Sequence, residues 1–342
     1  MNILIVRLGA LGDIVHAVPA AAALRAAMPD ARIDWLVERK HRPVLDLVEG
    51  LDRIVTLDGR SVAAWIDAVK RLRTARYDVA LDMQGLMKSA VLARASGAGR
   101  VAGFSIWHLR EKTARPFYSE TDAPAGADEA LSGHVIQKNL RLLRVLGVSD
   151  DRVVFPFRAI DSAVAREVAA RDGGTPFALV NPGAAWPNKR WPPERFGEVA
   201  SFLKDVRGLR SVVLWGPGEE GIAGAVVAAS QGAASLAPST TIADLIALSR
   251  AASLVIAGDT GPLHLATAAG APAVGLFGPT DPDRNGPWAP EDLVVSRYGT
   301  CACHYERRCH EPEWCFEGVS VAEVTAAVQA RLAAVGKSGP HV

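Results

Sequence analysis

The sequence predicts an α/β protein made of two doubly wound domains, each with a parallel β-sheet. With 342 residues the chain is long for a single hydrophobic core, so two domains are expected. Apolar runs alternate with amphipathic segments through both halves, a pattern typical of βαβ units and therefore of parallel sheets covered by helices. A glycine-rich turn that carries an aspartate follows an apolar run in each half, at Gly9–Asp13 and at Gly258–Gly261.

The first half contains five segments that are predicted to be strands. They are Asn2–Leu8, Arg32–Val37, Arg53–Leu57, Tyr77–Asp82 and Arg100–Phe104. The Ala-rich segment Ile14–Met28, with Pro19 in its early part, is expected to form one helix. Further helices are predicted between Val62 and Leu72, where apolar residues recur at helical spacing, and over Val135–Leu146. Residues 105–134 are polar and are expected to be irregular.

The second half repeats this pattern after a polar stretch, Arg158–Thr175, which is expected to include a connecting helix. We therefore expect the two domains to cover residues 1–160 and 175–342. The strands predicted for the second domain are Phe177–Asn181, Ser211–Trp215, Ser253–Ala257 and Ala273–Phe277, and its last helix is Ser320–Val335. Because ligands bind beyond the carboxyl ends of parallel strands, both domains are expected to face one central cleft.

Composition excludes several classes of protein. A net charge of +1 argues against a broad nucleic-acid-binding surface. The chain contains no apolar run near the ~20 residues that span a bilayer. Arg7, Asp13 and His16 interrupt the apolar N-terminal segment, so it is not expected to be a signal peptide. We expect a cytoplasmic protein that touches the membrane surface without entering it.

The turn after the apolar run Leu254–Ala257 has the features of an anion site. Pro262 suits the first turn of a helix, where free N–H groups and the helix dipole favour a bound diphosphate. Asp259, Thr260 and His264 converge on the same point. This turn is therefore predicted to be the floor of a nucleotide-sugar site.

The turn Gly9–Asp13 has the spacing G-x-x-G, whereas a dinucleotide-binding fold carries G-x-G-x-x-G. This difference weakens a nicotinamide-dependent oxidoreductase as the interpretation, although Glu38 lies near where a ribose-binding acid would. The two glycines are explained by a sharp turn, which does not account for the carboxylate of Asp13.

Other strand ends add candidate binding residues, each with a plain structural alternative. Lys189 and Arg190 lie in a loop rich in Pro and Trp and suit phosphate oxygens, although surface cations are common. Glu219 suits ribose hydroxyls or the N-terminus of its own helix. Lys88 follows the strand that ends at Asp82, and its charge suggests an anionic acceptor. Three more cations follow in the sequence, Arg110, Lys112 and Arg115. The alternative is that all these cations lie on a surface loop.

All four cysteines fall in one segment, at Cys301, Cys303, Cys309 and Cys315. Clustered thiols in a cytosolic chain suggest a metal more than disulfides, and tetrahedral thiolate ligation suits zinc or iron. The spacing lacks paired C-x2-C knuckles, so four reduced thiols in an extended loop are the alternative.

Several of these motifs, taken in their order along the chain, resemble family 9 of the glycosyltransferases. They are Leu4–Asp13, Asp82–Ala90, Lys189–Pro192, Asp259–His264 and Phe277–Pro282. The resemblance extends from Met1 to about Pro290, and within the family it is strongest to enzymes that add the first heptose of the lipopolysaccharide inner core.

The resemblance implies a GT-B fold, with an acceptor-binding N-terminal Rossmann-like domain and a C-terminal one that binds the ADP-sugar. It also implies inverting transfer of L-glycero-D-manno-heptose from ADP-heptose to the Kdo sugar of a lipid A precursor, with no cofactor required for catalysis. Asp13 matches the general base, and Arg110 an acceptor-contacting arginine. Residues that match donor-binding positions are Lys189, Glu219, Asp259, Thr260, Gly261 and His264.

Two features depart from this family pattern. Ala184 and Ala185 replace hydroxyl residues that some members carry, and the cysteine segment is more typical of members that use other acceptors. Transfer of a second heptose, or transfer to a different acceptor, is therefore the alternative within the family. A two-lobed sugar-binding protein without enzymatic activity is the alternative outside it, and it would have no use for Asp13.

Overall fold

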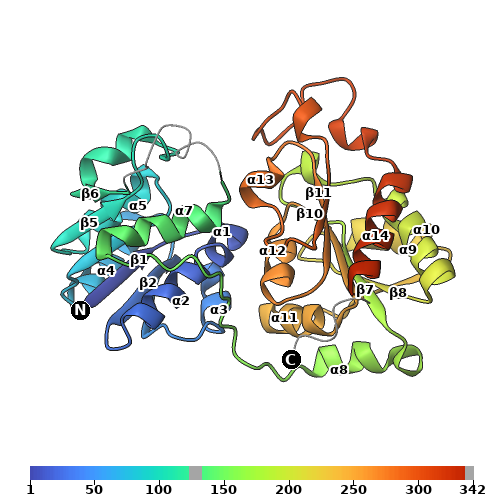
Figure 1. Ribbon diagram of the computed structural model, residues 1–342, viewed down its shortest axis with the longest axis horizontal. Helices are drawn as coiled ribbons and strands as arrows, with labels where there is room; N and C mark the ends of the chain where they lie inside the picture. The colour runs from blue at the N-terminus through green and yellow to red at the C-terminus, as the bar shows by residue number, and fades with distance from the viewer. Residues whose placement is uncertain (123–132, 336–342) are drawn as a thin grey trace. The chain divides into compact units, whose positions relative to one another are not determined.

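The computed structural model describes residues 1–122 and 133–335, and the chain separates into two compact units, Met1–Arg158 and Ala159–Val342. The polar stretch after Arg158 contains helix α8 (Ala163–Ala170) and the 3-10 turn η4 (Arg171–Gly174). Both elements belong to the second unit. Each unit is described separately below (Figure 1).

The first unit contains a parallel sheet with the strand order β3-β2-β1-β4-β5-β6. Its strands are β1 (Asn2–Val6), β2 (Arg32–Glu38), β3 (Arg53–Leu57), β4 (Val79–Asp82), β5 (Arg100–Gly103) and β6 (Glu120–Thr121). The five predicted strands are present, and the central β1 and β4 are buried. The strand order reverses between β1 and β4, which places the ends of these two strands at a switch point.

The helices of the first unit pack in pairs, α2 with α7 and α4 with α5 (Figure 1). They are α1 (Leu11–Val15), α2 (Val18–Ala27), α3 (Arg42–Leu45), α4 (Val62–Arg73), α5 (Met87–Ala95) and α7 (Val135–Leu142), with 3-10 turns η1 (Arg39–His41), η2 (Lys112–Phe117) and η3 (Leu143–Leu146).

The prediction of one continuous helix over Ile14–Met28 is wrong. The chain forms α1 and α2, which are separated at His16 and Ala17. Pro19 lies in the first turn of α2. Because proline lacks an N–H group and its ring clashes with the carbonyl four residues earlier, the helix starts afresh at this position. Residues 105–134, expected to be irregular, contain η2 and β6, and residues 123–132 of that range lie outside the described part.

The second unit has the same topology, in the order β12-β11-β10-β7-β8-β9, with parallel pairs throughout. Its strands are β7 (Phe177–Asn181), β8 (Arg210–Val213), β9 (Ala234–Leu236), β10 (Leu254–Gly258), β11 (Ala273–Phe277) and β12 (Leu293–Ser296). The strand order reverses between β7 and β10. The edge strands β6, β9 and β12 were missed because they are short and partly exposed, with at most three consecutive apolar residues.

Helices cover this second sheet in two groups, α9 with α10 and α14, and α11 with α8 and α12 (Figure 1). The helices not yet placed are α9 (Pro193–Arg207), α10 (Glu220–Ala229), α11 (Ile242–Ala251), α12 (Gly261–Ala268), α13 (Pro282–Asn285) and α14 (Val321–Val335), with 3-10 turns η5 (Pro187–Lys189), η6 (Tyr298–Thr300) and η7 (Cys315–Gly318).

The core of the second unit has two layers because successive strand residues face opposite sides of a sheet. Along β10, Leu254 and Ile256 belong to a large cluster that includes side chains of α9 and α14, such as Phe196 and Val324. Ala257 belongs instead to a smaller cluster with residues of α12 and β11. The sheet is therefore buried on both faces, which explains its nearly continuous apolar strands.

Among the residues that the structure describes, no helix is both long and apolar enough to cross a lipid bilayer.

Candidate active site

Three of the predicted site residues follow strands at which the order of each sheet reverses. Asp13 comes after β1, Lys189 after β7 and Asp259 after β10. In open parallel sheets, ligands bind outside the carboxyl ends of the strands at this switch point. The topology therefore puts the candidate base in one unit and the candidate phosphate-binding residues in the other, each at a binding position.

Asp13 is held in place by a buried arginine of the same unit. Its Oδ2 atom lies 2.8 Å from Nη2 of Arg7, and the backbone N–H of Ala10 donates to it at 3.3 Å. Arg7 is 8% exposed and also donates to the carbonyl of Met83, next to β4. The Asp13 side chain is 35% exposed, so the carboxylate is oriented by its partners and still open to solvent.

His41 is a neighbour of this turn that sequence reasoning missed. A Cβ atom at Gly9 would lie 3.0 Å from Nε2 of His41, so any side chain there would press against the imidazole. Burial lowers the pKa of His41 below its usual value. The only signal in the sequence was its place just after β2, in the turn η1.

Glu38, the candidate ribose-binding acid, is engaged by two lysines. Lys88 Nζ lies 2.8 Å from Oε1 of Glu38, and Lys40 Nζ lies 3.3 Å from Oε2. Burial raises the pKa of Glu38, but the bond and charge of Lys88 outweigh it, so the net pKa is lowered. Because both oxygens of this carboxylate are paired with lysines, it is poorly placed to accept hydrogen bonds from a ribose, which further weakens the oxidoreductase interpretation.

The two predicted acceptor residues lie near the end of β4. Lys88 is on α5 and makes the ion pair with Glu38, whereas Arg110 is exposed in the loop that precedes η2. That loop is attached to the turn after β4, because Glu111 N–H donates to the Gly85 carbonyl at 3.2 Å and Glu111 Oε2 accepts from Met87 N–H at 2.7 Å. Arg110 is thereby placed beside the start of α5.

In the second unit, Asp259 is the centre of the candidate donor site. Its carboxylate is 5% exposed and accepts from four side chains. Thr280 donates at 2.6 Å, Asn285 at 2.8 Å and His264 Nε2 lies 3.0 Å away, while Lys189 Nζ makes a short ion pair to Oδ2. Three segments of the chain, around residues 189, 259–264 and 280–285, therefore meet at one buried carboxylate.

The charge of Asp259 is stabilised by these partners. Burial alone would raise the pKa of the Asp259 carboxyl, but His264 and Lys189 outweigh burial and hold this pKa well below its usual range. The carboxylate is thus ionised at every physiological pH, and the Lys189 ammonium is fixed against it.

The N-terminus of α12 completes this region. Thr260 is the N-cap residue and Gly261 the first helical residue, with Pro262 in the first turn as predicted. The N–H groups of a first helical turn have no partner within the helix. A Cβ atom at Gly258 would lie 2.8 Å from the Lys189 carbonyl, so glycine there lets the Lys189 loop approach β10.

Glu219 lies at the end of the neighbouring strand β8. It is the N-cap residue of α10, but its side chain makes no cap hydrogen bond to that helix. Its Oε2 atom instead accepts from the Gly216 N–H at 3.0 Å, and a Cβ atom at Gly183 would lie 2.3 Å from its carboxyl group. The carboxylate therefore borders the Asn181–Lys189 loop.

Thr280 and Asn285, which complete the Asp259 cluster, were not predicted as site residues. They lie in and just after the motif Phe277–Pro282, which follows β11. The motif was visible in the sequence, but which side chain it would direct at Asp259 depends on the turn into α13.

The four cysteines lie close together, in two contacts. Cys303 Sγ is 3.5 Å from Cys309 Sγ, and Cys315 is beside Cys301. Burial raises the pKa of the Cys315 thiol to about 12. Within residues 1–122 and 133–335, no group of three or more His, Cys, Asp or Glu side chains is arranged to hold a metal ion. The expected zinc or iron site therefore finds no support.

The fold is that of an α/β protein with two Rossmann-like units, and the candidate site residues follow strand ends, where such folds bind nucleotides. The chain belongs to glycosyltransferase family 9 (heptosyltransferase), whose family model matches residues 65–315. It is 28% identical over 320 residues to lipopolysaccharide heptosyltransferase 1 of Pseudomonas aeruginosa, with 90% of this chain and 87% of that protein covered.

Two solved structures extend the comparison to the fold. A glycosyltransferase of family 9 from Veillonella parvula superposes with a TM-score of 0.80 at 22% identity, covering 97% of both chains. The Escherichia coli heptosyltransferase WaaC, solved with ADP, gives 0.76 at 23% identity and covers 97% of this chain and 100% of its own. The expected GT-B fold is confirmed.

Proposed function

We propose that this heptosyltransferase moves L-glycero-D-manno-heptose from ADP-heptose to the Kdo sugar of a lipid A precursor, in the synthesis of the lipopolysaccharide inner core. The observation that carries the proposal is the Lys189–Asp259 pair at the N-terminus of α12, a site suited to a sugar diphosphate. The similarity to a lipopolysaccharide heptosyltransferase 1 over most of both chains supports the same sugar and acceptor.

In the proposed reaction, the acceptor hydroxyl attacks the anomeric carbon of the heptose from the face opposite ADP. The new C–O bond forms as the bond to the diphosphate oxygen breaks, so the configuration inverts. The proton of the hydroxyl passes to the carboxylate of Asp13, which Arg7 orients at 2.8 Å. Positioned proton transfer of this kind typically contributes about 10²–10⁴-fold to the rate.

The departing ADP develops negative charge, which the donor site stabilises. Lys189 and the N–H groups at the start of α12 are fixed before the reaction begins, so they need no rearrangement as charge develops. Glu219 borders the same loop and is suited to accept hydrogen bonds from the ribose hydroxyls of ADP. No step in this scheme requires a metal ion.

On the acceptor side, Lys88 and Arg110 provide positive charge near the end of β4. A Kdo-bearing acceptor carries a carboxylate, and the planar guanidinium of arginine matches a carboxylate with two parallel hydrogen bonds. Because the acceptor is lipid-linked, we also propose that the enzyme works at the cytoplasmic face of the inner membrane.

The test is ADP release with ADP-heptose as the donor and two acceptors, Kdo-lipid A and the same molecule already carrying one heptose. Turnover with the unheptosylated acceptor alone is the expected result. Turnover only with the heptosylated acceptor would show that the enzyme transfers the second heptose and not the first. No turnover with either would contradict both the donor and the acceptor.

A further inference from the structure

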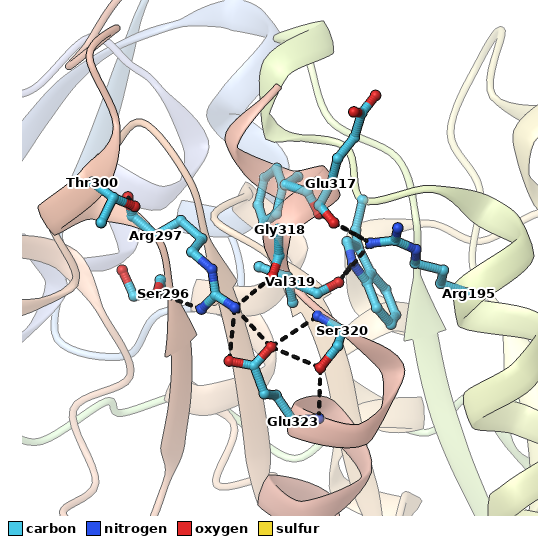
Figure 2. Close-up of polar contacts among 11 residues, drawn as sticks. Arg195, Ser296, Arg297, Thr300, Glu317, Gly318, Val319, Ser320 and Glu323 are labelled. Carbon is cyan, nitrogen blue, oxygen red and sulfur yellow. Dashed lines mark hydrogen bonds and ion pairs between the residues drawn. The ribbon is translucent and has the colours of Figure 1, made fainter. Parts of the chain in front are cut away.

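The loop between β12 and α14, residues 298–318, is closed at its base and reaches the donor site at its tip. We call it the cysteine loop, since it contains all four cysteines. At the base, Arg297 donates to the Gly318 carbonyl at 2.5 Å and to the two carboxylate oxygens of Glu323 at 2.7 Å (Figure 2). Arg195 of α9 donates to the carbonyls of Glu317 and Val319, both at 2.7 Å (Figure 2).

The tip of the cysteine loop is the segment between Cys303 and Cys309, whose Sγ atoms are 3.5 Å apart. In this segment Tyr305 has a φ of 57°, a left-handed conformation that few non-glycine residues adopt. Such a conformation persists only where surrounding contacts impose it. The tip is therefore a defined turn.

Consecutive residues of this turn contact the segments that frame Asp259. Tyr305 N–H donates to the Pro279 carbonyl at 2.9 Å, next to Thr280. The Glu306 carbonyl accepts from the Asn188 side chain at 2.8 Å, next to Lys189. The third residue, Arg307, has its guanidinium carbon 5.9 Å from the centre of the Trp186 ring.

Trp186 brings Arg307 and Lys189 together. The Lys189 ammonium lies 4.5 Å from the centre of the same ring, so the two cations are no more than about 10 Å apart. Both come from segments of the second unit that are more than a hundred residues apart in sequence. Their meeting at one ring is a product of the docked cysteine loop.

The positive charges of Lys189 and Arg307 differ in whether an acidic side chain already neutralises them, which matters for binding a diphosphate. The charge of Lys189 is compensated by Asp259, and the nearby Arg190 guanidinium donates to the Ala184 carbonyl at 2.8 Å. Arg307 is exposed and forms no ion pair with any acidic side chain in the described part of the chain. In contrast to Lys189, its charge is therefore not compensated by a carboxylate of the described residues.

We propose that Arg307 is a second diphosphate-binding residue, which binds the phosphate oxygens of the nucleotide donor from the tip of the cysteine loop. The guanidinium can offer two parallel N–H groups to one phosphate, a geometry that the Lys189 ammonium lacks. The contact with the Trp186 ring holds the guanidinium within about 10 Å of the Lys189 ammonium before the ligand binds. The proposal rests on the proposed function, since it needs an ADP-sugar as the donor.

The test compares the binding of ADP and of adenosine, which lacks phosphate, to the full-length protein by calorimetry. Arg307→Gln is expected to raise the Kd for ADP roughly tenfold, as expected for one charge-assisted hydrogen bond, and to leave that for adenosine unchanged. Arg308→Gln, the adjacent exposed arginine, is the matched control and should bind ADP like the wild type. Arg307→Lys should lose less affinity than Arg307→Gln.

Two results would overturn the inference. One is an ADP affinity of Arg307→Gln within twofold of the wild type. The other is an equal loss for ADP and adenosine, which would mean that Arg307 only supports the loop. Failure of the wild-type protein itself to bind ADP would instead overturn the proposed donor, so the two failures are distinguishable.

Discussion

Lys189 and Asp259 form a buried ion pair that joins the ends of two neighbouring strands, β7 and β10, in the second unit. The lysine side chain is 15% exposed and the aspartate 5%. Replacing one member of such a pair leaves the other charge without compensation, so each residue depends on the other. The pair therefore organises the candidate donor site, to which we propose that it also contributes charge.

Substitution Asp13→Asn should abolish most turnover without weakening donor binding. Asparagine keeps the shape of the side chain but cannot accept the acceptor proton, so kcat is expected to fall by about 10³-fold or more. The Kd for ADP should stay within twofold of the wild type, because the donor site lies in the other unit. ADP release and calorimetry measure the two quantities, and full activity would refute Asp13 as the base.

Substitution Lys189→Ala should weaken ADP binding by at least about tenfold, because a fixed ammonium is lost from the phosphate site. Lys204→Ala is the matched control, since Lys204 is an exposed lysine of α9 that donates only to the Gly232 carbonyl, at 3.2 Å. Calorimetry with ADP measures both variants. An unchanged affinity for Lys189→Ala would remove this residue from the donor site.

Substitution Thr280→Val should disturb the Asp259 cluster while keeping the volume of the side chain. It removes the hydroxyl that donates to Asp259 at 2.6 Å, and the expected loss in free energy of unfolding is about 1–3 kcal/mol. Thr300→Val is the control: its hydroxyl donates to the Arg297 carbonyl at an exposed position, and its loss should be within about 0.5 kcal/mol. Urea unfolding monitored by tryptophan fluorescence gives both values; similar losses would argue against a special role for the cluster.

His41 should make the stability of the protein fall at mildly acidic pH. Its pKa in the folded protein lies below its usual value of 6.5, because it is partly buried and lies near Lys40. Below about pH 6.5 the unfolded chain therefore binds a proton that the folded protein resists, which favours unfolding. Above that pH both states are neutral at this residue and the effect vanishes.

The measurement for His41 is the Tm of the wild type and of His41→Gln between pH 7.5 and 5.5. The wild type is expected to lose more Tm than the variant over this interval, since only the wild type carries the imidazole. The difference between the two curves isolates His41 from the other seven histidines of the chain. Parallel curves would show that this imidazole is not held in its neutral form.

Several features of the site were predictable from local sequence. Asp13, Lys189 and Asp259 each follow an apolar run, and a strand end in a parallel sheet is where ligands bind. Pro262 marked the start of α12 because a helix tolerates proline only in its first turn. These positions could be predicted because they depend on residues a few positions apart in the chain.

The edge strands β6, β9 and β12 were missed because they are short and partly exposed, so none has the long apolar run that marks a buried strand. The break between α1 and α2 was missed although its cause, Pro19, is local. Thr280 and Asn285 were missed because the fold, and not the local pattern, directs their side chains at a carboxylate more than twenty residues away.

The sequence by itself determined the alternation of strands and helices, the two turns that carry Asp13 and Asp259, and the family to which the motifs point. Only the tertiary structure decided which polar groups pair: Arg7 with Asp13, Glu38 with Lys88, four donors with Asp259, and Arg307 with Trp186. The physical reason is that secondary structure follows from local periodicity and backbone sterics, whereas the partner of a buried charge is set by strand order and loop docking, which join residues distant in the chain.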